Sequence, residues 1–509
     1  MRLNILIGGK AGQGINKVSE IVSRVLADEG YFTFNYRDYP SLIRGGHNFN
    51  VLCVSDKRVG SVDSVVDVIV ALDENTLKVH EKDLKKGGLV ISFDIFKEDL
   101  GRNLNIALAG ALCSVLGIEE KVLGEVVKQE LGDAAVGAVN IGYKSQSKDK
   151  CIACLEKLNN KIKIKSGSVA VAEGAVNSGI DLYVAYPMTP ATGVMNSLAG
   201  TLEHGKVFQA ENEIAVVNIG LGASFAGKRV VVGSSGGGFD LMTEGMSFQG
   251  ISEIPLVVYL AARPGPGTGV PTYTTQGDLD IALRAGHGEF PRVVIAPGDP
   301  VECVEKTNEA FYLAEKFRTL SIILSDKHLA ESEFSFDNSS HKPIRVEIKR
   351  DLPGKKIVKA SSYEHDKFGN TTEDAEITKK SADARMKKYE DIKKECKKLE
   401  MIKIFGKGKN LIIGWGSTKG VILDAMEGMD VRFLQVLYMK PLSDEIKKEI
   451  ISTGKCGGKV VIVENNVTGQ LGRLIREKTG IKIENRILKY DGRPFWCDEL
   501  RERLRGVLG

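Results

Sequence analysis

The chain has 509 residues, of which 42% are hydrophobic and 27% are charged, with a formal net charge of +4. This composition is typical of a soluble globular protein, and the length predicts three or four domains because a single core does not grow to this size. The small, interspersed charge argues against a nucleic-acid-binding protein, which would carry a concentrated basic surface. No run of about 18 apolar residues occurs, so we expect no membrane span.

The N-terminus and the cysteines predict a cytoplasmic protein. The first apolar run is too short for a secretory signal peptide. The eight cysteines are sparse, which fits a reducing compartment better than a disulfide framework. Cys151 and Cys154 are the one close pair, and without a second such pair we interpret them as structural or incidental, not as metal ligands.

Three regions alternate short apolar strands with amphipathic helices, which predicts an α/β fold of three parallel-sheet domains. The domains are expected at residues 1–160, 166–335 and 402–509, with a charged linker and a solvated helix at 336–401. In the first domain, strands are expected at 3–8, 51–56, 65–72 and 87–93, with a helix that ends near residue 29. In the second, they are expected at 181–187, 230–235, 255–262, 292–297 and 320–326.

Gly9, Gly12 and Gly14 lie in a turn between the first strand and the first helix. Glycines at such a turn let backbone N–H groups approach a phosphate at the helix N-terminus. The spacing is GxxGxG, which is neither the dinucleotide-binding GxGxxG pattern nor a Walker loop. A tight turn without a ligand is the alternative interpretation.

A second loop of the first region is rich in hydrogen-bond donors. It contains Arg44, His47 and Asn48 beside the glycine pair at 45–46. Donors on a flexible loop can hold an anionic ligand. Alternatively, the loop packs against a neighbouring subunit.

Polar residues follow two strands of the second region. Thr189 lies where a hydroxyl can meet a ligand at the edge of an α/β sheet, or it caps a helix that begins at Pro190. Arg263 ends another strand, and its guanidinium can bind a carboxylate bidentately. Alternatively, Arg263 forms an ion pair with Asp278 or Glu289.

The segment QAENEIAVVNIGL at 209–221 places Glu211 and Glu213 at the head of an apolar helix. Each can be a first-turn acid stabilised by the helix dipole. The other interpretation is that one of them is kept inside for chemistry. A Gly-rich loop, SSGGGF, follows the next strand at 234–239.

Taken together, eight segments resemble, in the same order, those of the 2-oxoacid:ferredoxin (2-oxoacid:acceptor) oxidoreductases in which the γ and α subunits are fused. They are GGKAGQGI, YRDYPSLIRGGHN, AYPMTPAT, QAENEIAVVNIGLGASFAGK, GGFDLMTEG, GPGTGVPT, AGHGEFPR and EHDKFGNTTED. The resemblance implies a γ-like domain at 1–160, a pyrimidine-type domain of thiamine-diphosphate enzymes at 166–335, and a transketolase-C-terminal-like domain at 402–509.

The implied reaction is the CoA-dependent oxidative decarboxylation of a 2-oxoacid to acyl-CoA and CO2, with electrons passed to ferredoxin. The sequence has neither a GDG segment followed by an Asn pair, which holds thiamine diphosphate through a divalent metal, nor a ferredoxin-like cysteine array. The resemblance therefore places Mg2+ and a [4Fe–4S] cluster on a separate β subunit, which shares the thiamine diphosphate site. A dimer of γα–β heterodimers is expected, with no metal on this chain.

The resemblance also implies roles for single residues. Glu213 matches the glutamate that activates the cofactor, and Glu211 is the alternative. Thr189, Arg263 and Thr272 match residues of the substrate pocket. CoA would lie against the γ-like domain, where the matching residues are Gly9, Gly12, Gly14, Arg44, His47 and Asn48.

The sequence leaves the substrate open. Tyr273 stands where relatives often have a basic residue, and the missing charge argues against a dicarboxylate such as 2-oxoglutarate. A nucleotide-dependent dehydrogenase or ligase is an alternative, based on the Gly-rich turns, but the GxxGxG spacing argues against it. A non-catalytic scaffold is another, and the presence of Glu213, Thr189 and Arg263 argues against that interpretation.

Overall fold

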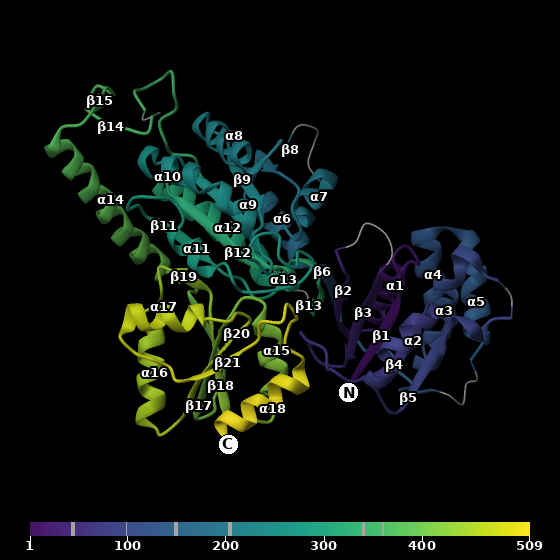
Figure 1. Cartoon of the computed structure of the whole chain (residues 1–509). Coiled ribbons are helices and arrows are strands. Elements are labelled where there is room, and N and C mark those ends of the chain that lie inside the picture. Colours follow the sequence, from purple (N-terminus) through teal and green to yellow (C-terminus); the bar gives the residue numbers. More distant parts are fainter. Residues whose placement is uncertain (42–45, 98, 147–150, 202–205, 338–341, 359–360) are drawn as a thin grey trace. The chain divides into compact units, whose positions relative to one another are not determined.

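The computed structural model describes residues 1–41, 46–97, 99–146, 151–201, 206–337, 342–358 and 361–509 (Figure 1). The chain forms two compact units. Unit 1 comprises Met1–Lys165, Ser332–Ser340 and Trp496–Arg501, and unit 2 comprises Ser166–Glu331, His341–Phe495 and Glu502–Gly509. No helix in the described ranges is both long enough and apolar enough to cross a bilayer.

Unit 1 is built on a seven-stranded sheet with the order β5-β4-β1-β3-β2-β13-β6. β1 pairs in parallel with β4 and antiparallel with β3, so this sheet is mixed. Its strands are β1 (Arg2–Lys10), β2 (Phe32–Asp38), β3 (His47–Ser55), β4 (Val66–Ala71), β5 (Leu84–Ser92), β6 (Ile162–Ser166) and β13 (Glu333–Asp337). Its helices are α1 (Ile15–Asp28), α2 (Glu74–His80), α3 (Leu104–Leu116), α4 (Glu120–Leu131) and α5 (Val136–Lys144).

The sequence pattern accounts for the layering of unit 1. β1 is apolar and buried along almost its whole length, as expected for a central strand covered on both faces. α1 buries Val18, Ile21, Val22 and Val25, the i, i+3, i+4 and i+7 spacing of a helix that packs one face on a sheet. α3 is buried almost all round, because α1, α4 and α5 surround it.

The first sheet of unit 2 has the order β19-β11-β12-β10-β9-β7-β8. All its neighbouring strands run parallel except β19, which pairs antiparallel with β11. Its strands are β7 (Leu182–Ala185), β8 (Val207–Gln209), β9 (Val230–Ser234), β10 (Leu256–Ala262), β11 (Arg292–Ile295), β12 (Leu320–Asp326) and β19 (Tyr438–Lys440). Its helices are α6 (Gly167–Asn177), α7 (Thr192–Thr201), α8 (Glu213–Phe225), α9 (Gly236–Leu241), α10 (Thr243–Ser252), α11 (Leu279–Arg284), α12 (Pro300–Phe317) and α13 (Lys327–Glu331).

The second sheet of unit 2 has the order β16-β18-β17-β20-β21, with only β16 antiparallel. Its strands are β16 (Ile402–Gly406), β17 (Asn410–Trp415), β18 (Val431–Val436), β20 (Val460–Glu464) and β21 (Asn485–Leu488). The accompanying helices are α15 (Thr418–Ala425), α16 (Glu445–Lys455) and α17 (Gln470–Thr479). The last helix, α18 (Cys497–Leu508), begins in unit 1 and ends in unit 2. Before this sheet come the short strands β14 (Glu364–His365) and β15 (Thr371–Thr372) and the mostly exposed helix α14 (Ala375–Cys396).

The two sheets of unit 2 share one hydrophobic core. A single cluster of buried side chains runs from Val184 in β7 to Ile483 before β21 and includes Trp415 of β17. β19, which comes from the C-terminal region, completes the edge of the first sheet through its pairing with β11. The expected fold class of several parallel-rich α/β sheets is confirmed, whereas the exact domain boundaries stay a prediction.

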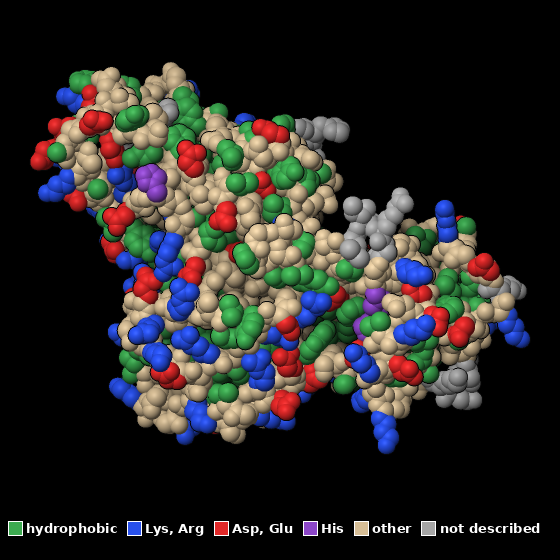
Figure 2. Space-filling view, in the orientation of Figure 1, with side chains coloured by type: hydrophobic (Ala, Val, Ile, Leu, Met, Phe, Trp, Pro, Cys, Tyr) green, Lys and Arg blue, Asp and Glu red, His purple; other side chains and the backbone are tan. Residues whose placement is uncertain are grey.

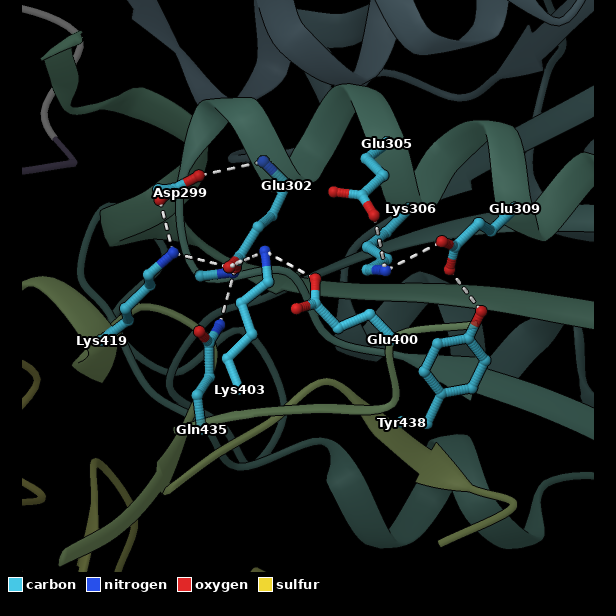
Figure 3. A network of polar contacts seen from close by, with 11 residues as sticks. Asp299, Glu302, Glu305, Lys306, Glu309, Glu400, Lys403, Lys419, Gln435 and Tyr438 are labelled. Carbon is cyan, nitrogen blue, oxygen red and sulfur yellow. Dashed lines mark hydrogen bonds and ion pairs between the residues drawn. The ribbon is translucent and has the colours of Figure 1, made fainter. Parts of the chain in front are cut away.

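A buried network of charges also joins the two sheets of unit 2 (Figure 3). Lys419 Nζ of α15 donates to Asp299 Oδ2 and to Glu302 Oε1, both at 2.6 Å. Gln435 of β18 donates to the other oxygen of Glu302 at 2.6 Å. Glu302 is 1% exposed, so its charge is balanced almost entirely by protein groups.

The cysteines follow a simple pattern. The structure pairs Cys151 and Cys154 as a disulfide, with Cα atoms 5.6 Å apart. The other six are free, and of these only Cys456 is exposed. Among the described residues, no group of three His, Cys, Asp or Glu side chains has the geometry of a metal site.

Candidate active site

The predicted site residues of unit 2 gather at one edge of its first sheet. Because β7, β8, β9 and β10 are parallel, the residues that follow their carboxyl ends meet at that edge. Thr189 follows β7, Glu213 follows β8 and Arg263 follows β10. The Gly-rich start of α9 follows β9.

Burial distinguishes the two neighbouring acids. α8 begins at Glu213, and Asn212 is its N-cap, with the side-chain oxygen accepting from Ala215 N at 2.9 Å. Glu213 is 3% exposed, and its Oε1 has no hydrogen-bond partner. Glu211 is exposed and precedes the cap, so the interpretation of Glu211 as a first-turn acid is wrong.

The glycines of α9 make room for the Glu213 carboxyl group. A Cβ atom at Gly238 would lie 2.3 Å from Glu213 Oε1 and 2.2 Å from Ser234 Oγ, closer than van der Waals contact allows. Ser234 is also buried without a hydrogen-bond partner for its hydroxyl group. Gly238 therefore lets the backbone of α9 lie directly against the carboxyl group.

Arg263 contacts Thr189 directly. Its Nη1 donates to the Thr189 carbonyl oxygen at 3.0 Å, and none of the ion pairs found within 4.0 Å in the described chain involves Arg263. The alternative in which Arg263 forms an ion pair with Asp278 or Glu289 is therefore wrong. Burial lowers the pKa of the Arg263 guanidinium, and the charges of Asp278 and Glu213 oppose that shift.

Thr189 does not cap a helix. α7 begins at Thr192, and the turn before it is closed by Ala191 N and Thr192 N, which donate to Met188 O. Thr189 instead presents its carbonyl oxygen to Arg263. The capping interpretation, which needed a helix from Pro190, is wrong.

Thr272 lies in the loop that follows Arg263. It is 6% exposed, and its hydroxyl oxygen has no hydrogen-bond partner. The loop folds back on itself, because Val270 N donates to Pro264 O and Tyr273 N donates to Val270 O, both at 3.1 Å. The loop that Arg263 begins therefore carries a buried hydroxyl group without a hydrogen-bond partner.

The sequence interpretation missed a second acid, Asp278, which it considered only as an ion-pair partner. Asp278 is the N-cap of α11, yet its side chain makes no capping hydrogen bond. Its buried Oδ2 has no partner, and a Cβ atom at Gly236 would lie 2.5 Å from it. Burial raises the pKa of Asp278 to about 7; Asp240 adds to this shift and Arg263 opposes it.

The predicted residues of unit 1 also come together. Antiparallel pairing of β1 and β3 places Gly9 opposite Asn48 and Lys10 opposite His47. Gly12 and Gly14 have φ values of +92° and +84°, which favour glycine, and Gly14 caps α1. A tight turn without a ligand has the same geometry, so this alternative to a ligand-binding turn stays open. Arg44 lies outside the described residues.

His47 belongs to a short chain of polar contacts. Its Nε2 lies 2.8 Å from His80 Nε2, and His80 Nδ1 lies 2.9 Å from Asp83 Oδ2. Burial lowers the pKa of His47, and His80 adds to the shift. His47 is thereby held in one orientation beside the glycine turn.

Comparison with known proteins decides the family. The family model described as "Pyruvate flavodoxin/ferredoxin oxidoreductase, thiamine diP-bdg" matches residues 173–401, and "Pyruvate ferredoxin/flavodoxin oxidoreductase" matches residues 4–95. The 2-oxoacid:ferredoxin oxidoreductase subunit alpha of Sulfolobus sp is 30% identical over 620 residues, covering 100% of this chain and 97% of that protein. The chain belongs to the 2-oxoacid:ferredoxin oxidoreductase family. The family expected from the sequence is confirmed.

Two further relatives of this oxidoreductase subunit are informative. The 2-oxoglutarate synthase subunit KorA of Archaeoglobus fulgidus is 30% identical over 358 residues, covering 68% of this chain and 100% of that protein. A solved 2-oxoglutarate:ferredoxin oxidoreductase from Magnetococcus marinus, with 2-oxoglutarate, coenzyme A and succinyl-CoA bound, superposes with a TM-score of 0.89 at 26% identity, and each chain is covered completely. The fold of the oxidoreductase subunit therefore matches a whole solved chain.

Substitution of Arg263 in the oxidoreductase subunit tests its predicted substrate contact. Arg263→Ala should raise KM for the 2-oxoacid by an amount equivalent to about 2–4 kcal/mol, because a charged contact is lost. Steady-state kinetics of the complex with its partner subunit measure this. Arg284→Ala is the control, since Arg284 is an exposed arginine paired with Asp280 and Glu477. An unchanged KM in Arg263→Ala would remove this residue from the substrate pocket.

The pH dependence of stability tests Asp278. Between pH 3.8 and about 7 the folded chain binds more protons than the unfolded chain, because folding raises the pKa of this carboxyl group. The free energy of unfolding should therefore fall as pH rises through that window. Asp278→Asn removes this dependence of the unfolding free energy on pH. At pH 8 the variant should be more stable by about 3–4 kcal/mol, the cost of burying the charged carboxylate that the raised pKa reports.

Denaturant unfolding of the isolated chain at pH 4 to 8 measures this effect. Asp280→Asn is the matched control, because Asp280 pairs with Arg284 and Arg473 on the surface, where such pairs contribute about 0–1 kcal/mol. If the free energy of unfolding of Asp278→Asn still falls with rising pH as in the parent, Asp278 is not the group that causes the pH dependence.

Proposed function

We propose that this chain supplies the cofactor-activating half of the active site in the CoA-dependent oxidative decarboxylation of a 2-oxoacid, with electrons passed to ferredoxin. The products are an acyl-CoA and CO2. One observation carries the proposal: Glu213 is buried against the backbone of Gly238, and its Oε1 has no partner among the described residues. An ionisable group held in this way needs a ligand to complete its hydrogen bonding.

The residues present fit thiamine diphosphate. A carboxyl group with a buried, unpartnered oxygen can hydrogen-bond the ring nitrogen of the cofactor's aminopyrimidine. When bound, thiamine diphosphate supplies the carbanion chemistry that decarboxylates the 2-oxoacid. Glu213 would hold and exchange a proton at that ring nitrogen, and its burial excludes water from the exchange.

Arg263 and Thr272 would orient the substrate. The guanidinium is fixed by its hydrogen bond to Thr189 O and has no carboxylate in direct contact among the described residues. The guanidinium can therefore donate hydrogen bonds to the carboxylate of the 2-oxoacid. Thr272 would offer its unpartnered hydroxyl group to the same substrate. We assign CoA to unit 1, at Gly9, Gly12, Gly14, His47 and Asn48, because these residues match the family's CoA-binding segments. Arg44 joins this set from the sequence alone.

A separate β subunit would complete the site. Apolar side chains near Glu213 are unusually exposed: Phe208 is 48%, Ile214 is 49% and Leu241 is 51% accessible. Figure 2 shows hydrophobic side chains over α8 and β8, whereas Lys and Arg side chains are numerous over α16. An apolar area beside a site that lacks a diphosphate-binding motif favours a protein partner. We assign Mg2+ and the [4Fe–4S] cluster to that partner, in a dimer of γα–β heterodimers in the cytoplasm.

Reconstitution tests the proposal. The purified chain alone should neither decarboxylate 2-oxoacids nor reduce viologen, because half of the site is missing. Addition of the β subunit, thiamine diphosphate, Mg2+ and CoA should give 2-oxoacid-dependent viologen reduction with release of CO2. Activity of the chain without a partner would overturn the division of the site between two subunits, and inactivity of the complete assembly toward a panel of 2-oxoacids would overturn the function.

A further inference from the structure

A small cavity in unit 2 is lined mainly by basic side chains. It lies at the C-terminal end of α12, beside the segment at 345–350, and has a volume of about 320 Å³. That volume is at the lower end of the range of small-molecule pockets. Tyr312 and two acids, Glu315 and Glu347, line the cavity together with five basic residues, which are Lys316, Arg318, Arg345, Lys349 and Arg350.

Two of these cations are matched by carboxylates. Arg350 forms an ion pair with Glu315, and both side chains are almost fully buried. Lys316 Nζ lies 2.9 Å from Glu395 Oε1, on a carboxylate of α14 that also pairs with Lys398. The Nε atom of Arg350 is nevertheless buried without a hydrogen-bond partner. The two charges are thus compensated within the chain, while one buried donor of the cavity lining is left over.

The other three cations share too few carboxylates. Arg345 and Lys349 pair with the same acid, Glu347, at 3.3 and 2.6 Å. Arg318 Nε donates to the carbonyl oxygen of Glu253 at 3.3 Å, and none of the ion pairs in the described part of the chain involves the Arg318 guanidinium. Three cations and one carboxylate leave two positive charges, which match the charge of a phosphate dianion.

Arg318 occupies a backbone position that favours glycine. It is the C-cap of α12, with φ +52° and ψ +57°, and its N–H donates to Ala314 O. Glycine is the usual residue where a helix ends in the left-handed region, because a side chain is strained there. A strained residue whose side chain lines a cavity is typical of a binding site.

The segment at 345–350 is fixed beside α12. Ile344 N donates to Asn308 Oδ1 at 2.7 Å, and Asn308 Nδ2 donates to Ile344 O at 3.1 Å. At the other end, Arg350 Nη2 donates to Ser224 O at 2.7 Å. These hydrogen bonds hold both walls of the cavity in place, so a ligand need not assemble the cluster of cations.

We propose that this cavity binds the phosphate group of a small anionic ligand, either inorganic phosphate or a phosphate ester. Arg318 donates to the phosphate from its Nη atoms, Arg350 donates from its buried Nε, and Lys349 completes the charge balance. None of the lining residues belongs to the site proposed for catalysis. The inference therefore goes beyond the proposed function and does not depend on it.

Calorimetric titration of the full chain with inorganic phosphate tests this site. The titration is made at pH 8, where phosphate is a dianion, and at constant ionic strength. Arg318→Gln should weaken binding at one site per chain by about 10- to 100-fold, because charged hydrogen bonds are lost. Arg318→Gly should weaken it equally without lowering the midpoint of thermal unfolding, because glycine relieves the left-handed backbone. Loss of binding is then not a consequence of unfolding.

Adenosine monophosphate, a phosphate ester, distinguishes the two sources of the ligand. Tighter binding of the ester than of inorganic phosphate assigns an ester to the cavity, and weaker binding assigns inorganic phosphate. Arg473→Gln is the control and should bind as the parent does, because Arg473 is exposed on α17 and pairs with Asp280. Failure of the parent to bind either probe would overturn the inference. Unchanged affinity and stoichiometry in Arg318→Gln would place the anion elsewhere and would also overturn it.

Discussion

Replacement of Glu213 by glutamine should lower kcat of the complete enzyme by about 10²- to 10⁴-fold, the usual contribution of a positioned acid–base group. Glutamine keeps the size of the side chain and its place against Gly238, but it cannot exchange a proton at the cofactor. The Glu213 carboxyl group is buried and lacks a partner for Oε1, so no neighbouring group within the chain can take over its role. Viologen reduction with saturating 2-oxoacid and CoA measures the effect.

Glu211→Gln is the matched control for this experiment. Glu211 is exposed and lies two residues before Glu213, so its replacement should change kcat by no more than about twofold. Size-exclusion chromatography should show that both variants assemble with the partner subunit. Equal losses of kcat in the two variants would leave the assignment of Glu213 without support.

Replacement of Lys419 by methionine should lower the free energy of unfolding by about 3–5 kcal/mol, because it removes the cation that contacts both carboxylates of a buried pair. Glu302 keeps Lys403 Nζ at 3.1 Å. Lys419 Nζ contacts both Asp299 and Glu302, and the Lys419 side chain is 8% exposed (Figure 3). Methionine fills a similar volume, so the loss reports the charge and not a cavity. Denaturant unfolding of the isolated chain at pH 7 measures it.

Lys448→Met is the control for the buried network. Lys448 also pairs with a glutamate, Glu445, but its side chain is 68% exposed. Such surface pairs contribute about 0–1 kcal/mol, so the free energy of unfolding of this variant should be close to that of the parent. A loss in Lys419→Met no larger than that in Lys448→Met would show that the buried charges are compensated without Lys419.

The sequence predicted those parts of the site that follow directly from chain order. Parallel strands bring the residues after their carboxyl ends together, so the grouping of Thr189 and Arg263 at one sheet edge could be predicted from chain order. Glu213 was preferred over Glu211 only through the family resemblance. Asp278 could not, because an acid before a helix is usually a cap. Only the structure shows that its side chain turns away from α11 toward Gly236.

The contacts between distant segments were the least predictable from the sequence. Arg493 meets Tyr273 where hydrogen bonds from Thr274 N and from Asn465 join two segments that are far apart in the chain. No periodicity or local motif indicates such a contact. For the same reason β19 was not expected in the first sheet of unit 2, since a three-residue strand has too weak a sequence pattern.

The position of β19 has a consequence for dissecting the protein into fragments. Residues 438–440 complete a sheet whose other strands all precede residue 327, and the buried cluster continues across both sheets. A fragment that ends near residue 401 would expose β11 as a new sheet edge, together with half of a hydrophobic core. We therefore expect residues 166–401 to aggregate when expressed alone, and the smallest soluble piece of unit 2 to contain both sheets.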